Sequence, residues 1–311
     1  MAFLRSLRPS GGCSAIRIGS SRLMPPVAVV TDTTHYLPRE VADAHGLRQV
    51  SLYVNWRGRQ DREADLSDLT AYYEHLRTAS ELPTTSQPSI GDFLATYEPL
   101  LAEGLDVVSI HLSGAVSGTC EAARQAKARL EEQGAGGERI EVVDAATAAG
   151  GLGMVVLPAA AVAQGGGDRK QVVARARAAR AALKMWFCVD TLDYLRRGGR
   201  IGAAQAWLGT ALRIKPILTV EAEVTPIERV RTAGRAFERM VYYMQARAQD
   251  GADAWVVQHI QAPDVAQRLV ERGRELYGCE PLFVSEVGPV IGTHVGPGLI
   301  GVGGIPQSLL D

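Results

Sequence analysis

The stretch that most constrains the fold is residues 107–129, where an apolar segment runs through a loop of small residues into a helix-forming segment. Residues 107–112 are apolar and rich in β-branched side chains, which is typical of a buried strand. Residues 113–119 read SGAVSGT and predict a loop, and residues 121–130 are mostly good helix formers. A strand that passes directly into a helix is the repeating unit of an α/β fold.

The loop at 113–119 has the chemistry of an anion-binding site. The first N–H groups of a helix have no partners within the helix, and the helix dipole favours negative charge at that end. Gly118 lets a ligand approach the backbone, and Ser117 and Thr119 add hydroxyl donors. An ordinary helix cap uses the same residue types, so this loop alone leaves both interpretations open.

A second group of hydroxyl side chains lies in residues 84–89, which read TTSQPS. Ser89 and Asp92 form a capping-box pattern that opens a helix at 90–103. The cap has no use for the three hydroxyl residues at the start of the segment, among them Thr85. The sequence therefore predicts a loop that supplies further neutral hydrogen-bond donors.

Two glycine-rich segments complete the set of candidate functional segments. Residues 292–298 read GTHVGPG and predict a tight turn that contains His294. A histidine in such a turn is more often structural or solvated than functional. Residues 194–201 read YLRRGGRI and predict a basic turn before a helix at 203–212.

Strands and helices alternate along the first half of the chain, which predicts a mostly parallel sheet. The predicted strands are 27–31, 49–54, 107–112 and 140–143, and the predicted helices are 66–79, 90–103, 121–132 and 148–164. The second half is predicted to hold helices at 170–184, 235–248 and 263–277, with strands near Phe187 and at 216–220, 224–228, 254–260 and 281–284. A short turn at 221–223 between two strands indicates a mixed, partly antiparallel sheet in this half.

The predicted fold class is thus α/β, with two α/β domains. The glycine loop at 164–168 is the best boundary, and it divides the chain into 24–167 and 168–311. Residues 1–23 contain arginine and serine but no acidic residue, a composition that resembles a transit peptide. A flexible tail, or a translation start at Met24, fits better with a strand that begins at Val27.

We therefore expect residues 1–23 to be dispensable, because they carry only positive charge and show no helical or strand period. Protein that begins at Met24 should have the same melting temperature as the full chain and bind ligand equally. A large loss of stability in the shortened protein would contradict this expectation.

Composition argues against several classes of function. The net charge of −1 gives no reason to expect binding to nucleic acid or to acidic membranes. No apolar run approaches the ~20 residues of a membrane helix, so stable membrane insertion is not expected. The four cysteines form no CxxC pair and the six histidines are dispersed, so no metal site is predicted. Unpaired thiols suit a reducing compartment, and we expect a cytoplasmic protein.

Taken together, the four segments resemble the DegV family of bacterial fatty-acid-binding proteins over residues 27–304. The resemblance rests on the order and spacing of short motifs: VTDT (30–33), TSQPS (85–89), SGT (117–119), VD (143–144), VDTL (189–192), GGRI (198–201), IKPIL (214–218), RVR (229–231) and GTHVGPG (292–298). Two positions depart from the family pattern. Gly114 stands where the family usually has a second serine, and Cys120 stands where an aromatic residue is common.

The resemblance implies two α/β domains with a lipid between them. It implies that Thr85, Ser117 and His294 contact or approach the carboxylate of a long-chain fatty acid. The N–H of Gly118 and the hydroxyl of Thr119 complete this set of donors. The bound fatty acid is then a ligand, and no cofactor is expected.

The resemblance also implies a partner. Arg200 and Arg231 match family arginines implicated in docking an ATP-dependent fatty acid kinase. In that scheme the chain catalyses nothing: it holds the lipid and presents the carboxylate to the kinase, which makes the acyl phosphate on the carrier.

The alternative is a serine-dependent lipid hydrolase or acyltransferase that uses Ser117 with His294. Against it, the serine lies in SGT and not in a strained GxSxG turn, and no motif supplies an acidic partner for the histidine. A nucleotide-binding enzyme is a third hypothesis, but the chain lacks both GxGxxG and a P-loop lysine. The residues around the acyl chain are not identified; the apolar segments 154–163 and 206–212 are candidates, with plain core as the simpler interpretation.

Overall fold

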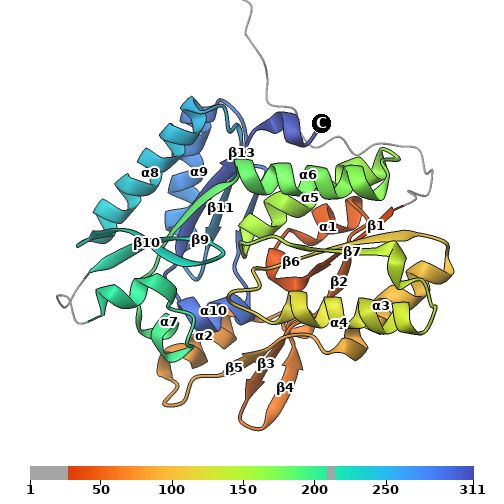
Figure 1. The fold of residues 1–311 in the computed structure, drawn as a ribbon. Helices are drawn as coiled ribbons and strands as arrows, with labels where there is room; N and C mark the ends of the chain where they lie inside the picture. The colour runs from red at the N-terminus through yellow and green to blue at the C-terminus, as the bar shows by residue number, and fades with distance from the viewer. Residues whose placement is uncertain (1–26, 209–213) are drawn as a thin grey trace, which may run out of the picture.

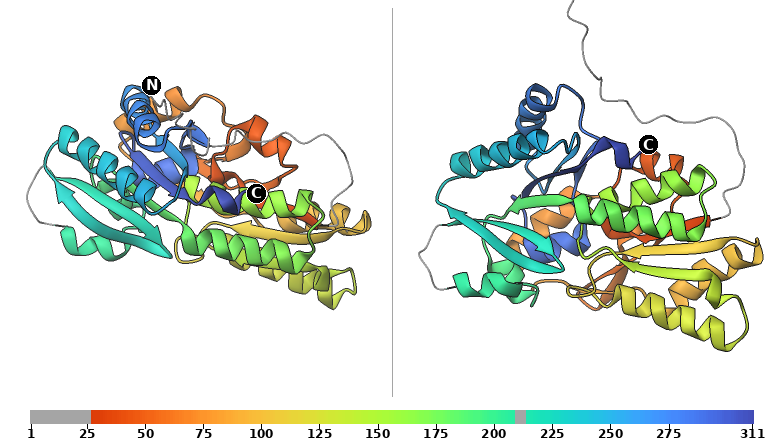
Figure 2. Two further views of the ribbon diagram at one scale, coloured as in Figure 1. Left: turned by 90° about the horizontal axis from the view of Figure 1, so that it is seen from above. Right: turned by 45° about the horizontal axis from the view of Figure 1, so that its top comes forward.

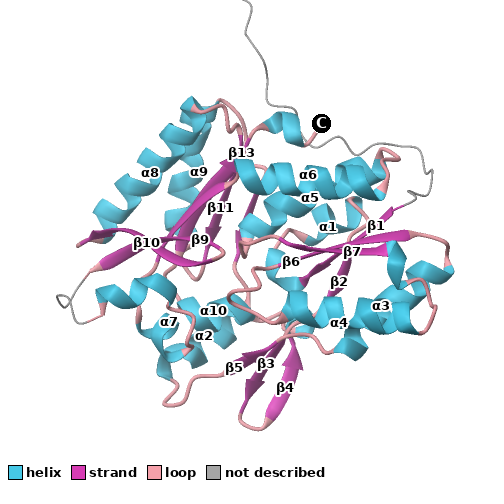
Figure 3. Ribbon diagram, in the orientation of Figure 1, coloured by secondary structure: helices cyan, strands magenta, loops and turns pink. Residues whose placement is uncertain are grey.

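The structure, a computed structural model, describes residues 27–208 and 214–311, which form two groups of strands and helices side by side (Figures 1 and 2). Strands and helices alternate through most of the chain, as the α/β prediction requires (Figure 3). The predicted tail at 1–23, Met24, and the last part of the helix predicted at 203–212 lie outside the described residues. The described start of that helix is a 3-10 helix, Gly202–Trp207.

A four-stranded parallel sheet forms the N-terminal half. Its order is β2-β1-β6-β7, with β1 at Val27–Asp32, β2 at Arg48–Val50, β6 at Asp106–His111 and β7 at Ile140–Asp144. One face packs against α3 (Ile90–Ala102) and α4 (Thr119–Glu132), and the other against α5 (Gly150–Gln164) and α6 (Arg169–Ala182). Both faces are buried, which explains the continuous apolar run in β6. A short helix, α1 (Arg39–Ala44), connects β1 to β2.

The single strand predicted at 49–54 is wrong, because two strands of different sheets share this range. After β2 the chain leaves the parallel sheet and enters a small antiparallel sheet of order β4-β3-β5. These strands are β3 (Tyr53–Trp56), β4 (Arg59–Arg62) and β5 (Thr84–Ser86). Arg57 and Gly58, both with positive φ, make the two-residue turn between β3 and β4.

The hydroxyl-rich segment is therefore a strand over Thr84–Ser86 and not a loop. Its residues are polar and give no alternating apolar pattern, but pairing with β3 satisfies the backbone. Helix α2 (Leu69–Thr78) lies between β4 and β5 in the chain. The remaining predicted elements agree with the observed ones to within a few residues at their ends.

A six-stranded mixed sheet of order β10-β9-β8-β13-β11-β12 forms the C-terminal half, as predicted. Its strands are β8 (Lys184–Cys188), β9 (Lys215–Glu221), β10 (Glu223–Val230), β11 (Ala254–His259), β12 (Phe283–Glu286) and β13 (Ile300–Ile305). Only the β11–β12 pair is parallel in this sheet over the described residues. Helices α8 (Ala233–Gln249) and α9 (Pro263–Tyr277) cover one face.

The central strand β13 was not predicted, because its sequence IGVGGI looks like a loop. Glycine is needed there for close approach between strands. A Cβ added at Gly303 would lie 2.8 Å from the Lys184 carbonyl oxygen, and one at Gly304 would lie 2.9 Å from that of Ala254.

The two halves share part of their core. Helix α10 (Pro289–Val295), from the C-terminal half, contacts α2, β3 and β5 of the N-terminal half as well as α7 (Asp193–Arg197). One apolar cluster includes buried residues from Val27 to Ile305. The division into 24–167 and 168–311 stays a prediction; its boundary falls in the turn between α5 and α6, two helices that pack against each other.

Candidate ligand-binding site

A cavity of about 370 Å³ lies between the two halves. Its volume is within the range of small-molecule sites. The face of the mixed sheet that α8 and α9 leave free forms one wall, and β5, α10 and the loop before α4 form others. The apolar lining consists mainly of Leu52, Leu112, Val116, Ala148, Ala149, Met185, Phe187, Leu195, Val220, Val224, Val287, Val290, Ile291, Val295 and Leu299. Such a surface favours an apolar ligand.

The topology explains why a site forms here. Strands β1 and β6 are neighbours, while β2 and β7 lie on opposite sides of them, so the strand order reverses between β1 and β6. Ligands of open α/β sheets bind outside the carboxyl ends of strands at such a point. The loop at 113–118 leaves β6 here, and α4 follows at Thr119 with Gly118 as its N-cap.

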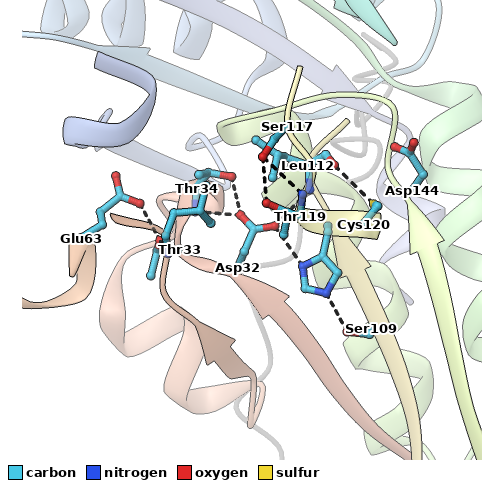
Figure 4. Close-up of polar contacts among 12 residues, drawn as sticks. Asp32, Thr33, Thr34, Glu63, Ser109, Leu112, Ser117, Thr119, Cys120 and Asp144 are labelled. Atoms are coloured by element: carbon cyan, nitrogen blue, oxygen red, sulfur yellow. Dashed lines mark hydrogen bonds and ion pairs between the residues drawn. The ribbon is translucent and has the colours of Figure 1, made fainter. Parts of the chain in front are cut away.

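A buried carboxylate fixes the base of this loop. Asp32, at the end of β1, accepts hydrogen bonds from the N–H and hydroxyl of Thr34, from the N–H of Leu112 at 3.0 Å, and pairs with Nδ1 of His111 at 3.0 Å (Figure 4). Burial raises the pKa of Asp32. The hydrogen bond and charge of His111 and the hydrogen bonds from Thr34 and Leu112 lower it by more, so the pKa of Asp32 lies below its usual value. The ends of β1 and β6 are thereby held together.

The same network contains a serine, a histidine and an aspartate in the order of a catalytic triad. Ser109 Oγ lies 2.6 Å from His111 Nε2, whose Nδ1 faces Asp32. All three side chains are fully buried, and the Ser109 hydroxyl also accepts a bond from Tyr97 at 2.7 Å. Because no substrate reaches Ser109, this arrangement is structural.

Thr85 and His294 meet although 209 residues separate them in the chain. Thr85 Oγ1 lies 2.7 Å from His294 Nε2. The histidine is on α10 and not in a tight turn as predicted; the turn follows at Gly296. The other ring nitrogen, Nδ1, is buried and has no hydrogen-bond partner among residues 27–208 and 214–311. A Cβ at Gly198 would lie 2.2 Å from that nitrogen, so the glycine makes room for the ring.

Ser117 and Gly118 line the cavity, whereas Thr119 is buried behind them and is not part of the lining. The hydroxyls of Ser117 and Thr119 are 2.9 Å apart. Gly118 is needed because Gln87 occupies the space beside it: a Cβ would lie 1.9 Å from Gln87 Oε1. Gln87 also lines the cavity but was not among the predicted site residues. Its position inside the TSQPS motif is the sequence feature that could have indicated it.

Arg200 and Arg231 are both exposed but occupy different places. Arg200 lines the cavity and donates to the carbonyl oxygens of Val116 and Gly198. Arg231 follows β10 and is not part of the lining. Hydrogen bonds thus link Thr85 to His294 and Arg200 to the loop of Ser117, and the charge of Arg200 is near enough to His294 to lower the pKa of its imidazole. These groups form the polar corner of the cavity, the name used below for Thr85, Ser117, Arg200 and His294.

The described residues of the two candidate segments for the acyl chain, 154–163 and 206–208, do not line the cavity. Residues 154–163 belong to α5, where all but Ala161 and Val162 are buried in the core beneath the parallel sheet. Residues 209–212 of the other candidate lie outside the described part of the chain. In the described ranges, no helix is long and apolar enough to cross a membrane, and no three His, Cys, Asp or Glu side chains gather as a metal site would require.

The nucleophile alternative lacks its essential bond. His294 Nε2 is bonded to Thr85, and Ser117 Oγ is bonded to Thr119. No hydrogen bond joins Ser117 to His294 within 27–208 and 214–311, and no carboxylate there orients the histidine ring. A serine hydrolase requires both contacts.

Comparison with known proteins gives the family. A model for the DegV family, described as an uncharacterised protein family, matches residues 26–307. The chain belongs to the DegV family. A DegV domain-containing protein of Streptomyces coelicolor is 41% identical over 279 residues, which is 89% of this chain and 97% of the relative. Protein DegV of Bacillus subtilis is 33% identical over 281 residues, covering 89% and 98% of the two chains.

Solved DegV structures have the same fold. A DegV family protein from Thermus thermophilus, whose structure is described by its fatty acid binding, has a TM-score of 0.80 and 35% identity, covering 90% of this chain and 99% of its own. DegV of Bacillus subtilis, described as a fatty acid binding protein, has a TM-score of 0.80 at 33% identity with the same coverage. The mixed and parallel sheets of this chain are therefore those of the DegV fold.

The first test of the site concerns the charge of His294. Burial, with the nearby Arg200 guanidinium, lowers the pKa of His294 to about 4. Between that value and the ordinary one near 6.5, the unfolded chain binds a proton that the folded protein does not, so stability falls as the pH falls through this window. Replacing His294 with Gln should reduce the loss of unfolding free energy between pH 7 and pH 4.5 by about 2 kcal/mol.

Urea unfolding of the ligand-free protein at the two pH values measures this difference. His75→Gln, on the exposed side of α2, is the control for loss of an imidazole. An equal change in both variants would show that the buried site of His294 is not the cause.

Proposed function

We propose that this protein is a carrier that holds a long-chain fatty acid in the cavity, with the carboxylate in the polar corner and the acyl chain along the apolar walls. The observation that carries the proposal is the 2.7 Å pair of Thr85 and His294 in a cavity whose walls are otherwise mostly apolar. Relatives whose structures are described as fatty-acid-binding support it.

The corner suits a carboxylate better than other head groups. Thr85 and Ser117 offer neutral hydroxyl donors, whereas Arg200 lies at the exposed side and already donates to the carbonyl oxygens of Val116 and Gly198. Hydrogen bonds to a charged group contribute about 1.5–3 kcal/mol each. A carboxylate beside His294 would raise the pKa of the imidazole, because opposite charges favour the charged form.

The acyl chain would supply most of the affinity. Each buried methylene contributes about 0.8 kcal/mol. A chain of about sixteen carbons therefore offers more than the few hydrogen bonds of the corner. The corner then fixes the orientation of the ligand, and the walls retain it.

We further propose that the protein acts without catalysis and presents the carboxylate to an ATP-dependent fatty acid kinase. Arg200 is exposed at the polar corner, where a partner that brings ATP to the carboxylate would dock, so that a carboxylate oxygen can attack the γ-phosphorus and ADP can leave. Arg231 is exposed on a separate segment and would extend the contact. Rim charges of this kind set association rates more than ligand retention.

Thr85→Ala and Ser117→Ala should each weaken fatty-acid binding by roughly tenfold, since losing one bond to a buried carboxylate costs about 1–3 kcal/mol. The double variant should lose less than the sum, because both groups share one ligand. The measurements are mass spectrometry of lipid extracted from the purified protein and titration with a fatty acid. Thr84→Ala is the matched control, because this neighbouring threonine of β5 is exposed and does not line the cavity.

Protein that neither carries nor binds a fatty acid would refute the carrier hypothesis. Ester hydrolysis that disappears in Ser117→Ala would favour the hydrolase instead.

Arg200→Ala and Arg231→Ala should slow acyl-phosphate formation by the cognate kinase while leaving lipid affinity nearly intact. The rates should be compared at two salt concentrations, because an electrostatic contact weakens with salt. Arg129→Ala, on the exposed face of α4, controls for loss of a surface charge. Unchanged kinase rates in both variants would remove these arginines from the partner surface, and loss of lipid affinity would make them ligand contacts.

A further inference from the structure

Glu63 is a buried carboxylate that the carrier model leaves unexplained. It follows β4 and is 6% exposed. Its Oε2 accepts a bond from the Thr33 hydroxyl at 2.5 Å, a contact visible in Figure 4. Its Oε1 accepts bonds from the Tyr36 hydroxyl and from the N–H of Val290, both at 2.8 Å. No lysine, arginine or histidine forms an ion pair with it among the residues that the structure describes.

The direction of these bonds follows from their other partners. Tyr36 Oη accepts a bond from the N–H of Ile291 at 3.2 Å, and Thr33 Oγ1 accepts one from the N–H of Leu52 at 3.3 Å. Each hydroxyl therefore has its own proton free to point at Glu63. Three donors converge on the carboxylate, which fits its ionised form.

These bonds hold the start of α10. The N–H of Val290 binds Glu63 directly, and the N–H of Ile291 binds it through Tyr36. A helix of seven residues is too short to be stable alone, so α10 depends on such tertiary contacts. Four of its residues line the cavity: Val290, Ile291, His294 and Val295.

We propose that Glu63 is a positioning residue for the ligand site, which anchors the first turn of α10 and so sets the position of His294 against Thr85. The inference rests on the proposed lipid-carrier function. It makes retention of the fatty acid depend on a residue that does not line the cavity.

Protonation should weaken the anchor. Burial is the largest influence and raises the pKa of Glu63 to about 7, against its three hydrogen bonds. The protonated acid carries a hydrogen where donors already point, so the Thr33 or Tyr36 hydroxyl must turn its own proton away to accept it, and the set of three donors is broken. The charges that act on Glu63 and on its tyrosine neighbours come from Asp32 at the end of β1, Tyr36, Tyr72 and Tyr73 of α2, and Glu286 of β12. Two histidines lie on the elements that Glu63 contacts: His35 between Thr33 and Tyr36, and His294 on α10, and burial is the largest influence that lowers the pKa of each to about 4.

The pH dependence separates anchoring from stability. Because the folded pKa is raised, the native state binds more protons than the unfolded chain between about pH 4.5 and pH 7, so the contribution of Glu63 to stability falls as the pH rises. Lipid retention, in contrast, should improve as the pH rises and the carboxylate ionises. A purely structural role would move both in the same direction.

The test compares the wild-type chain with Glu63→Gln, and with Tyr97→Phe as a control. Tyr97 donates a buried hydrogen bond to Ser109 and, within the described part of the chain, makes no hydrogen bond with α10. The measurements are the release rate of a fluorescent fatty acid between about pH 6 and pH 8 and amide hydrogen exchange of α10 in ligand-free protein. At pH 8 we expect Glu63→Gln to release lipid roughly tenfold faster, to lose the pH dependence that the wild type shows, and to exchange the α10 amides faster.

Wild-type release rates and pH dependence in Glu63→Gln would overturn the proposal, as would an equal effect of Tyr97→Phe. If the wild type takes up no fatty acid, the carrier function is refuted. Amide hydrogen exchange of ligand-free protein still tests the anchoring role: if the α10 amides exchange at the same rate in Glu63→Gln as in the wild type, Glu63 does not anchor α10. Should Glu63→Gln fail to fold, Tyr36→Phe removes one donor and keeps the carboxylate. It should raise the release rate by roughly threefold.

Discussion

The buried carboxylate of Asp32 is the interaction on which the site depends. An ionised group in the protein interior is costly unless its bonds are complete, and here it accepts from Thr34 and Leu112 and pairs with His111. Those partners come from the 3-10 turn that follows β1 and from the end of β6, so the charge is stable only while the two strands end side by side. The loop that carries Ser117 starts directly after Leu112, so the hydrogen bonds of Asp32 fix where this loop begins.

Neither half of the chain contains the site alone. Thr85 and Ser117 come from the N-terminal half, while Arg200 and His294 come from the C-terminal half. Helix α10 carries His294 to the N-terminal half, where three side chains hold the helix in place. Glu63 binds the N–H of Val290 and Tyr72 binds the hydroxyl of Thr293. Tyr73 donates to the carbonyl oxygens of residues 287 and 288, just before the helix. The cavity is thus a property of the contact between the halves, and the core that they share maintains it.

Local chemistry could be predicted from the sequence, but its long-range partners could not. The strand, loop and helix around Ser117 follow from apolar patterning and helix propensity, and the excess hydroxyls marked Thr85. The strand β13 was not predicted because half of its residues are glycines, which give no apolar pattern. The strand β5 was not predicted because its residues are polar. Glu63 lies in the polar run RQDREAD and looks like a surface residue; only its contact with α10, more than 200 residues away, distinguishes it.

The polar corner also suggests how a carrier can hold a ligand firmly and still give it up. A fully buried ion pair would have to be desolvated on binding and broken on delivery, at a cost of several kcal/mol each way. Here the hydroxyls are neutral, burial keeps His294 uncharged at neutral pH, and the guanidinium of Arg200 is exposed. In the proposed complex, affinity resides in the acyl chain and orientation in the corner. A carboxylate held in this corner would lie near the exposed Arg200, where, in the proposed scheme, a partner enzyme would reach it without dislodging the apolar chain that retains the lipid.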